Sequence, residues 1–151
     1  MKVAVTGHRP ERLSKVDRKS VECWLDGIMK TLRACYDDVE LISGMAQGVD
    51  QIAALTAVNN GVGLRCYMPY KRKVKHMSDL VRFLLDFAIE VRYISEEYSG
   101  NQCYIERDRR MVDDCDLLIV VWDGIECGGT YQTYKYALNK GRDMLIYPWK
   151  N

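Results

Sequence analysis

The sequence predicts an α/β fold of the Rossmann-like kind: a three-layer αβα arrangement around a mostly parallel sheet of about six strands. Two observations carry this prediction. Short apolar runs alternate along the chain with longer amphipathic segments, which is the pattern of repeated strand–helix–strand units. Turns that contain glycine follow three of these apolar runs, at the places where such units join a strand to the next helix.

Six apolar runs have the length and composition of strands. They are Lys2 to Thr6, Val39 to Ile42, Leu64 to Met68, Glu90 to Ile94, Leu117 to Trp122, and Met144 to Tyr147. The fifth of these runs is the most apolar, and its continuous apolar character is typical of a strand that is buried on both faces.

Five amphipathic segments are predicted to be helices. Ser14 and Asp17 have the spacing of a helix-capping box, and apolar residues recur on one helical face from Val21 to Cys35. The other helices are expected to begin after Gly48 and end near Gly61, to carry Leu80 to Phe87, and to cover about Gln102–Asp114 and Thr130–Lys140.

Length and composition limit the function. The 151 residues fit one domain, spanning 1–151, and 22 basic against 21 acidic residues leave a net charge of +1. This balance counts against nucleic acid as a partner.

No stretch approaches the ~20 apolar residues of a membrane span, and the first residues are too quickly polar for a signal peptide, so we expect a cytoplasmic protein without a membrane partner. The six cysteines lack zinc-type spacing, and we expect neither a metal nor a cofactor.

Two glycine-containing loops stand directly before predicted helices, Ser43–Gly48 and Gly128–Thr130. Glycine lets backbone N–H groups approach an anion, and the helix dipole favours negative charge at the same place. Both loops therefore predict a site for a phosphate or a phosphorylated sugar. Neither has the pattern of a P-loop, and the G-x-G-x-x-G pattern of nicotinamide dinucleotide enzymes is absent from the sequence.

Three motifs together resemble a known family. They are Val3-Ala4-Val5-Thr6-Gly7-His8-Arg9-Pro10, Ser43-Gly44-Met45-Ala46-Gln47-Gly48-Val49-Asp50, and the run Met111–Gly124 followed by Gly128-Gly129-Thr130. In this order they resemble the YpsA-like family of the SLOG superfamily, which also includes the DNA-processing protein DprA and the LOG cytokinin-activating enzymes. The resemblance implies a Rossmann-like domain that binds nucleotides or nucleotide-derived ligands.

The sequence also resembles two groups of enzymes, but it lacks some of their catalytic residues. LOG-type phosphoribohydrolases have an Arg-Lys pair and a later G-T-x-x-E; here Arg107 matches the arginine, Asp108 stands at the lysine position, and Thr133 stands at the glutamate position. Nucleoside deoxyribosyltransferases also place their nucleophilic glutamate at the position of Thr133. Cleavage of an N-glycosidic bond needs a carboxylate. Glu126 and Asp123 lie in the same loop and are the candidate catalytic residues.

The carboxyl ends of parallel strands meet at one edge of a sheet, so we expect the loops 7–10, 43–48 and 123–130 to form one ligand site. In the main hypothesis this site binds or senses a nucleotide or a nucleotide-derived small molecule, with backbone N–H groups and Arg107 against its phosphate. The candidate ligand-binding residues are Gly7, His8, Arg9, Ser43, Gly44, Gln47, Gly48, Asp50, Arg107, Asp123, Gly128, Gly129 and Thr130.

Two other functions are kept as alternatives. One is an enzyme that hydrolyses a nucleotide N-glycosidic bond, as LOG-like phosphoribohydrolases or deoxyribosyltransferase-like enzymes do. The other is single-stranded DNA binding, which the loop Ser43–Asp50 suggests by its similarity to DprA and which the charge balance disfavours. We also expect a homo-oligomer, because a small Rossmann-like domain often completes its site or covers an edge by pairing.

Overall fold

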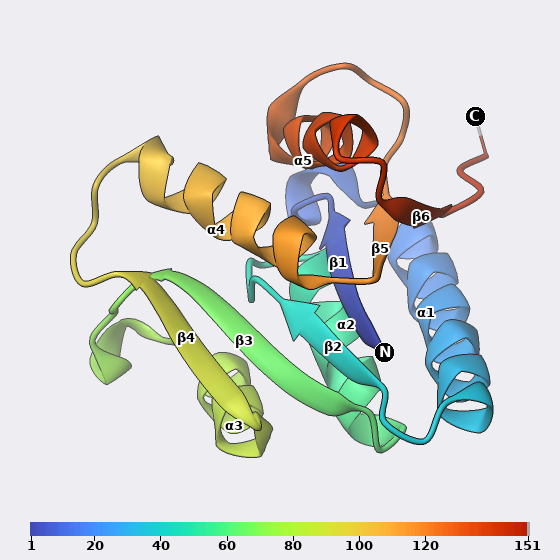
Figure 1. Ribbon diagram of the computed structural model, residues 1–151, viewed down its shortest axis with the longest axis horizontal. Helices are drawn as coiled ribbons and strands as arrows, with labels where there is room; N and C mark the ends of the chain where they lie inside the picture. Colours follow the sequence, from blue (N-terminus) through green and yellow to red (C-terminus); the bar gives the residue numbers. More distant parts are fainter. Residues whose placement is uncertain (151) are drawn as a thin grey trace.

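The computed structural model describes residues 1–150 and contains one six-stranded sheet (Figure 1). The strands are β1 (Lys2–Gly7), β2 (Glu40–Ser43), β3 (Gly63–Tyr70), β4 (Glu90–Ser95), β5 (Leu117–Val121) and β6 (Asp143–Ile146). They lie in the order β4-β3-β2-β1-β5-β6, and all five pairings between neighbours are parallel. The predicted fold class is confirmed.

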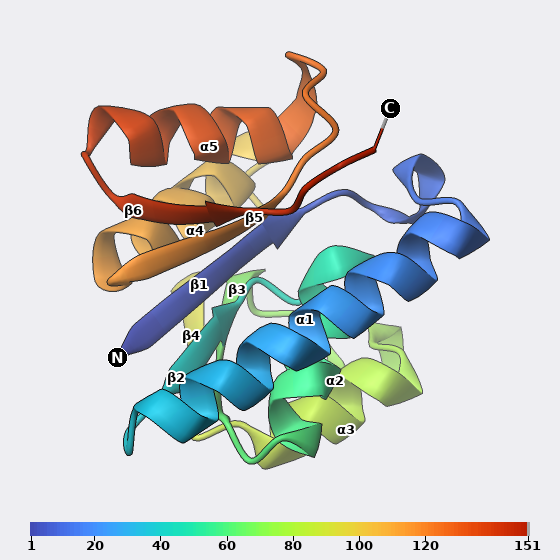
Figure 2. The same cartoon turned by 90° about the vertical axis from the view of Figure 1, so that its right-hand side faces the viewer.

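Five α-helices connect the strands and form the two outer layers. They are α1 (Lys15–Cys35), α2 (Val49–Asn59), α3 (Asp79–Phe87), α4 (Asn101–Asp114) and α5 (Gly128–Asn139). Helices α1, α2 and α3 cover one face of the sheet, whereas α4 and α5 cover the other (Figure 2). Two single 3-10 turns, η1 (Pro10–Arg12) and η2 (Val74–His76), follow β1 and β3.

Local sequence signals explain where the helices begin. The predicted capping box at the start of α1 is confirmed: the Asp17 N–H donates to Ser14 Oγ at 3.0 Å, and the Ser14 N–H donates to the Asp17 carboxylate at 3.3 Å. Ser78 caps α3 with a single hydrogen bond, its hydroxyl accepting from the N–H of Val81. Helix α5 begins at Gly128, two residues before the predicted start at Thr130, so the second glycine loop forms the first turn of the helix itself.

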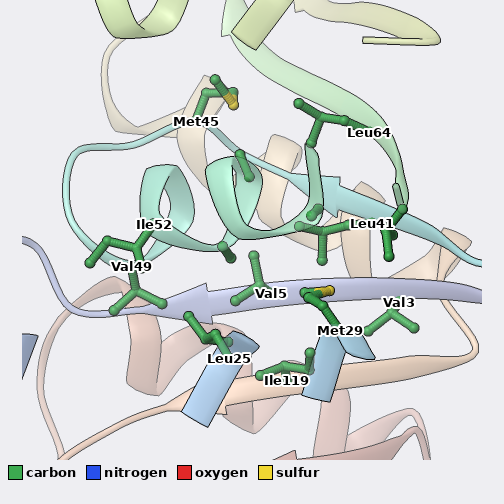
Figure 3. Packing of buried hydrophobic residues seen from close by; sticks show 14 of the residues in the cluster. Val3, Val5, Leu25, Met29, Leu41, Met45, Val49, Ile52, Leu64 and Ile119 are labelled. Atoms are coloured by element: carbon green, nitrogen blue, oxygen red, sulfur yellow. The ribbon is translucent and has the colours of Figure 1, made fainter. Parts of the chain in front are cut away.

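The core lies on both sides of the sheet because successive residues of β1 face opposite layers. Val3 and Val5 pack beneath α1 and α2, and Figure 3 shows Leu25 and Met29 of α1 beside Val5. Ala4 faces the opposite cluster, beneath α4 and α5. Strand β1 is therefore fully buried at its centre and fixes the position of the loop that follows it.

The strand order changes direction at β1. The chain builds β2, β3 and β4 on one side of β1, and then α4 leads back so that β5 and β6 form on the other side. Gly7 of β1 pairs with Val121 of β5, so the loops that follow these two strands leave the sheet side by side. Ligands of open α/β sheets bind at such a switch point.

No helix within residues 1–150 is both long enough and apolar enough to cross a membrane.

Candidate functional site

A cleft of about 580 Å³ lies at the switch point, and we call it the switch-point cleft. Its size falls in the range of roughly 300–1,000 Å³ that is usual for small-molecule sites. The predicted residues that line it are Gly7, His8, Arg9, Asp50, Arg107, Gly128, Gly129 and Thr130. The loops after β1 and β5 and helix α4 thus meet around one space, whereas the predicted loop 43–48 contributes only Ala46 to its lining.

His8 joins the ends of the two central strands. Its ring is 2% exposed, and its Nε2 atom accepts the backbone N–H of Asp123 at 2.9 Å. Burial lowers the pKa of His8, and the Arg12 guanidinium acts in the same direction, while Asp123 opposes them. The imidazole is therefore neutral at pH 7 and holds the carboxyl ends of β1 and β5 together.

Asp123 is occupied by contacts within the protein. Arg12 donates from Nη2 to both carboxylate oxygens at 2.7 Å, and the Ile125 N–H donates to one of them at 3.0 Å. Burial acts to raise the pKa of Asp123, but the hydrogen bonds from Ile125 and Arg12 outweigh it and leave the pKa below its ordinary value. Glu126 is exposed in the same loop. Neither carboxylate is among the residues that line the cleft.

The first glycine loop, which leads into α2, is packed against its neighbours. A Cβ on Gly48 would lie 2.4 Å from the His8 carbonyl oxygen, and the φ of Gly48 is +98°. The N–H of Val49 donates to the same carbonyl oxygen. Ser43 is fully buried and donates its hydroxyl to the Asp50 carbonyl at 2.8 Å. These residues shape the loop instead of facing the cleft.

The predicted residues Gly44 and Gln47 lie beside a smaller cavity of about 170 Å³, which Arg9 and Arg107 also line. A Cβ on Gly44 would lie 2.7 Å from Arg107 Nη1 and 2.9 Å from Asp50 Oδ2. The side chains of Arg107 and Asp50 thus occupy the space that a side chain at Gly44 would fill.

Arg107 and Asp50 are buried charged residues at the wall of the cleft, 4% and 7% exposed. Arg107 donates from Nη1 to the Gly44 carbonyl at 2.5 Å and from Nε to Asp108 at 2.7 Å. Asp50 accepts the Ala46 N–H at the long distance of 3.4 Å. Burial raises the pKa of Asp50 to about 7, although the Arg107 guanidinium acts in the opposite direction. The carboxyl group of Asp50 is thus divided between its neutral and charged forms at neutral pH.

The second glycine loop, at the start of α5, is open. No heavy atom lies within 4 Å of the place where a Cβ on Gly129 would stand, and the nearest atom to one on Gly128 is Arg12 Nη1 at 3.4 Å. Both glycines line the cleft at the positive end of the helix dipole. This loop has both the space and the polarity to hold an anion.

Several cleft residues were not among those predicted from the sequence. Arg12 comes from η1, while Tyr98, Asn101, Tyr104 and Asp108 come from the β4–α4 connection and from α4. The sequence signals Asp108 only by its departure from the LOG pattern. Tyr98, Asn101 and Tyr104 could not be found, because the strand order had to be known before α4 and the connection to it could be placed beside β1. Arg12 lies close in sequence to the predicted loop 7–10, but no motif marks it. Within residues 1–150 there is no group of three histidine, cysteine or acidic residues that could hold a metal ion.

Known proteins with similar sequences and structures include DprA. The DNA processing protein DprA of Streptococcus pneumoniae is 27% identical over 153 residues, which cover 97% of this chain and 50% of that protein. Its X-ray structure superposes with a TM-score of 0.75 at 24% identity, covering 99% of this chain and 50% of that one. The chain spans about half the length of the curated relative it matches. No protein-family model matches the chain.

Two further structures share the fold at lower identity. DNA processing protein A from Helicobacter pylori, described for its single-stranded DNA binding mode, has a TM-score of 0.76 at 16% identity and covers 99% of this chain and 66% of that one. The molybdenum cofactor carrier protein of Chlamydomonas reinhardtii has a TM-score of 0.65 at 14% identity and covers 96% and 74%. These similarities show the Rossmann-type fold.

Proposed function

We propose that the protein binds a nucleotide or a nucleotide-derived small molecule in the switch-point cleft, as a YpsA-like member of the SLOG superfamily. The observation that carries this proposal is the meeting of an open helix N-terminus with arginine side chains at one switch point. Gly128 and Gly129 leave space before α5, and Arg9 and Arg107 line the same cleft. A ligand phosphate fits this combination of backbone N–H groups and guanidinium groups.

The contacts of Arg107 suit it to this role. Its Nη1 atom donates to the Gly44 carbonyl and its Nε atom donates to Asp108, so the guanidinium keeps one orientation. The same two hydrogen bonds fix the directions of its remaining N–H groups. A group fixed in this way loses little conformational entropy when an anion binds. Arg9 is exposed and supplies a second cation at the edge of the cleft.

Calorimetric titration with nucleoside mono- and diphosphates and ADP-ribose derivatives tests the proposal. We expect at least one of them to bind, and Gly129→Asp to weaken that binding at least about tenfold, because a carboxylate then occupies the anion site. Gly27→Asp is the matched control, because Gly27 of α1 is equally open and lies outside the cleft. The proposal is wrong if no compound binds, or if Gly129→Asp leaves binding unchanged.

Single-stranded DNA is a second candidate ligand. The expectation that nucleic acid is not a partner is unsupported, because a similar structure belongs to a protein described for its single-stranded DNA binding mode. The ring centroid of Tyr70 lies 5.4 Å from that of Tyr98 and 6.3 Å from that of Tyr104, and Tyr98 is 62% exposed. The Arg72 guanidinium lies 5.3 Å from the centroid of the Tyr70 ring. Aromatic rings beside cations are the usual platform for unpaired bases.

Fluorescence anisotropy with an oligothymidylate tests this second candidate. Binding by DNA phosphates should weaken steeply as salt increases, and Tyr98→Ala should weaken it further by removing a stacking surface. Tyr36→Ala is the control, since Tyr36 is an exposed tyrosine at the far end of α1. Absent binding, or binding that does not depend on salt, excludes this candidate.

A further inference from the structure

A second cavity, of about 370 Å³, lies between α4 and α5, and we call it the α4–α5 chamber. Helix α4 contributes Tyr104, Ile105 and Arg109 to its lining, and α5 contributes Gln132 and Tyr136. The two helices run next to each other over the sheet (Figure 2). Of the residues predicted to bind a ligand, only Gly129 lines the chamber.

The chamber adjoins the switch-point cleft. Asn101, Tyr104, Asp108 and Gly129 line both cavities, so one ligand can reach from the cleft into the chamber along these residues. The wall that the two cavities share is open at Gly129, because no atom lies within 4 Å of where its Cβ would stand.

The side chains at the junction are fixed by hydrogen bonds. Thr133 donates its hydroxyl to the Gly129 carbonyl at 2.9 Å and lies 3.4 Å from one carboxylate oxygen of Asp108. The other Asp108 oxygen accepts from Arg107 Nε at 2.7 Å. Asp108 is therefore held between the cation of the cleft and the wall of the chamber, and its oxygen near Thr133 has capacity to accept a further hydrogen bond.

The two cavities differ in chemistry. The cleft has the helix N-terminus and arginines that suit a phosphate, whereas the chamber offers the apolar surfaces of Tyr104, Ile105 and Tyr136 among polar side chains. The Tyr136 hydroxyl donates to Asp113 at 2.9 Å, and the Arg109 guanidinium lies 5.3 Å from the centroid of the Tyr136 ring. Aromatic rings and guanidinium planes are the surfaces on which nucleic-acid bases stack. The amides of Asn101 and Gln132 can pair with polar atoms at the edge of such a ring.

We propose that the α4–α5 chamber holds the nucleobase, or an equivalent planar ring, of a ligand whose phosphate occupies the switch-point cleft. This inference rests on the proposed nucleotide binding and names the part of the protein that selects the ligand. Phosphate recognition is common to all nucleotides, so discrimination among them falls to Asp108, Asn101 and Gln132 in the chamber.

Calorimetry that compares ribose 5-phosphate with the 5′-monophosphates AMP, GMP, CMP and UMP separates the two cavities. All five compounds carry the same phosphate and sugar, and only the four nucleotides carry a base. We expect at least one nucleotide to bind about tenfold or more tightly than ribose 5-phosphate, because the base adds stacking contacts in the chamber.

Two variants reduce the space in the chamber. Gln132→Trp and Ile105→Trp each lay an indole over the chamber from an exposed position that lies outside the switch-point cleft. Each should cancel the advantage of the nucleotide while changing the affinity for ribose 5-phosphate by less than about twofold. Gln102→Trp is the matched control, because Gln102 is an exposed glutamine of α4 that lines neither cavity, and it should keep the advantage.

The outcomes distinguish this inference from the proposed function. If ribose 5-phosphate binds but no nucleotide binds more tightly, or if the advantage persists in both Gln132→Trp and Ile105→Trp, the chamber is not the base site and phosphate binding in the cleft still stands. If the wild-type protein binds none of the five compounds, the inference about the chamber is wrong, and the wider panel of diphosphates and ADP-ribose derivatives decides the proposed function.

Discussion

The two glycine loops each stand at the start of a helix but have opposite environments. Before α2, an added methyl group on Gly48 would meet the His8 carbonyl at 2.4 Å, whereas before α5 an added methyl group on Gly129 would meet no atom within 4 Å. In the first loop the glycine allows two segments of protein to touch. In the second loop the same residue type leaves space that a ligand can fill. A glycine before a helix therefore indicates that another group can approach the backbone closely, but it does not indicate whether that group belongs to the protein or to a ligand.

Gly48→Ala is expected to have the largest effect on this contrast. The added methyl group clashes with the His8 carbonyl, and the φ of +98° is one that alanine rarely adopts. The free energy of unfolding should fall by about 3 kcal/mol or more. Urea denaturation followed by circular dichroism measures it, and a loss below about 1 kcal/mol would show that the first loop is not tightly packed.

Asp50 beside the first loop should make stability depend on pH. Its pKa is raised from 3.8 to about 7 in the folded protein, so between these values the native chain keeps a proton that the unfolded chain has lost. Stability therefore falls as pH rises through this window, by at most about 1.4 kcal/mol per pH unit.

The variant Asp50→Asn isolates this contribution, because the titrations of His8 and Asp123 are common to both proteins. Denaturation at several pH values from 4 to 8 should show Asp50→Asn gaining stability relative to the wild type as pH rises. A constant difference across the range would contradict the raised pKa.

The β5–α5 loop contains two carboxylates, Asp123 paired with Arg12 and Glu126 exposed to solvent. Their substitution should change the free energy of unfolding by different amounts. Asp123→Asn removes the ion pair with Arg12 and should lower the free energy of unfolding by about 1 kcal/mol, since the pair is only partly buried. Glu126→Gln, at an exposed position, should change it by less than about 0.5 kcal/mol. Equal effects in urea denaturation would contradict the structural role of Asp123.

Gly129→Ala is expected to have a small effect on the free energy of unfolding, of opposite sign to that of Gly48→Ala. Its added methyl group meets no neighbour, and alanine restricts the unfolded chain more than glycine does, so stability should rise by about 0.5 kcal/mol. The same urea denaturation measures it. A loss of more than about 1 kcal/mol would mean that the second loop is as crowded as the first, and the contrast between them would be lost.

Much of the fold could be predicted from the sequence because its signals are local. Alternating apolar runs gave the six strands, and the Ser14–Asp17 spacing gave the start of α1, since both depend on residues a few positions apart. The edge of the sheet that carries the site followed from the same pattern, because loops after parallel strands share one edge. The strand order could not be predicted from these local patterns, because it depends on where α4 places the chain after β4.

The sequence by itself determined which residue types gather at the carboxyl edge of the sheet, and only the tertiary structure decided what each of them does. Arg12 meets Asp123 across 111 positions, and Arg107 meets Gly44 across 63. Such contacts leave Asp123 occupied, orient Arg107, bury Asp50 and keep Gly129 open. Burial and pairing set the charge and the availability of a side chain, and both arise from segments that no local pattern brings together.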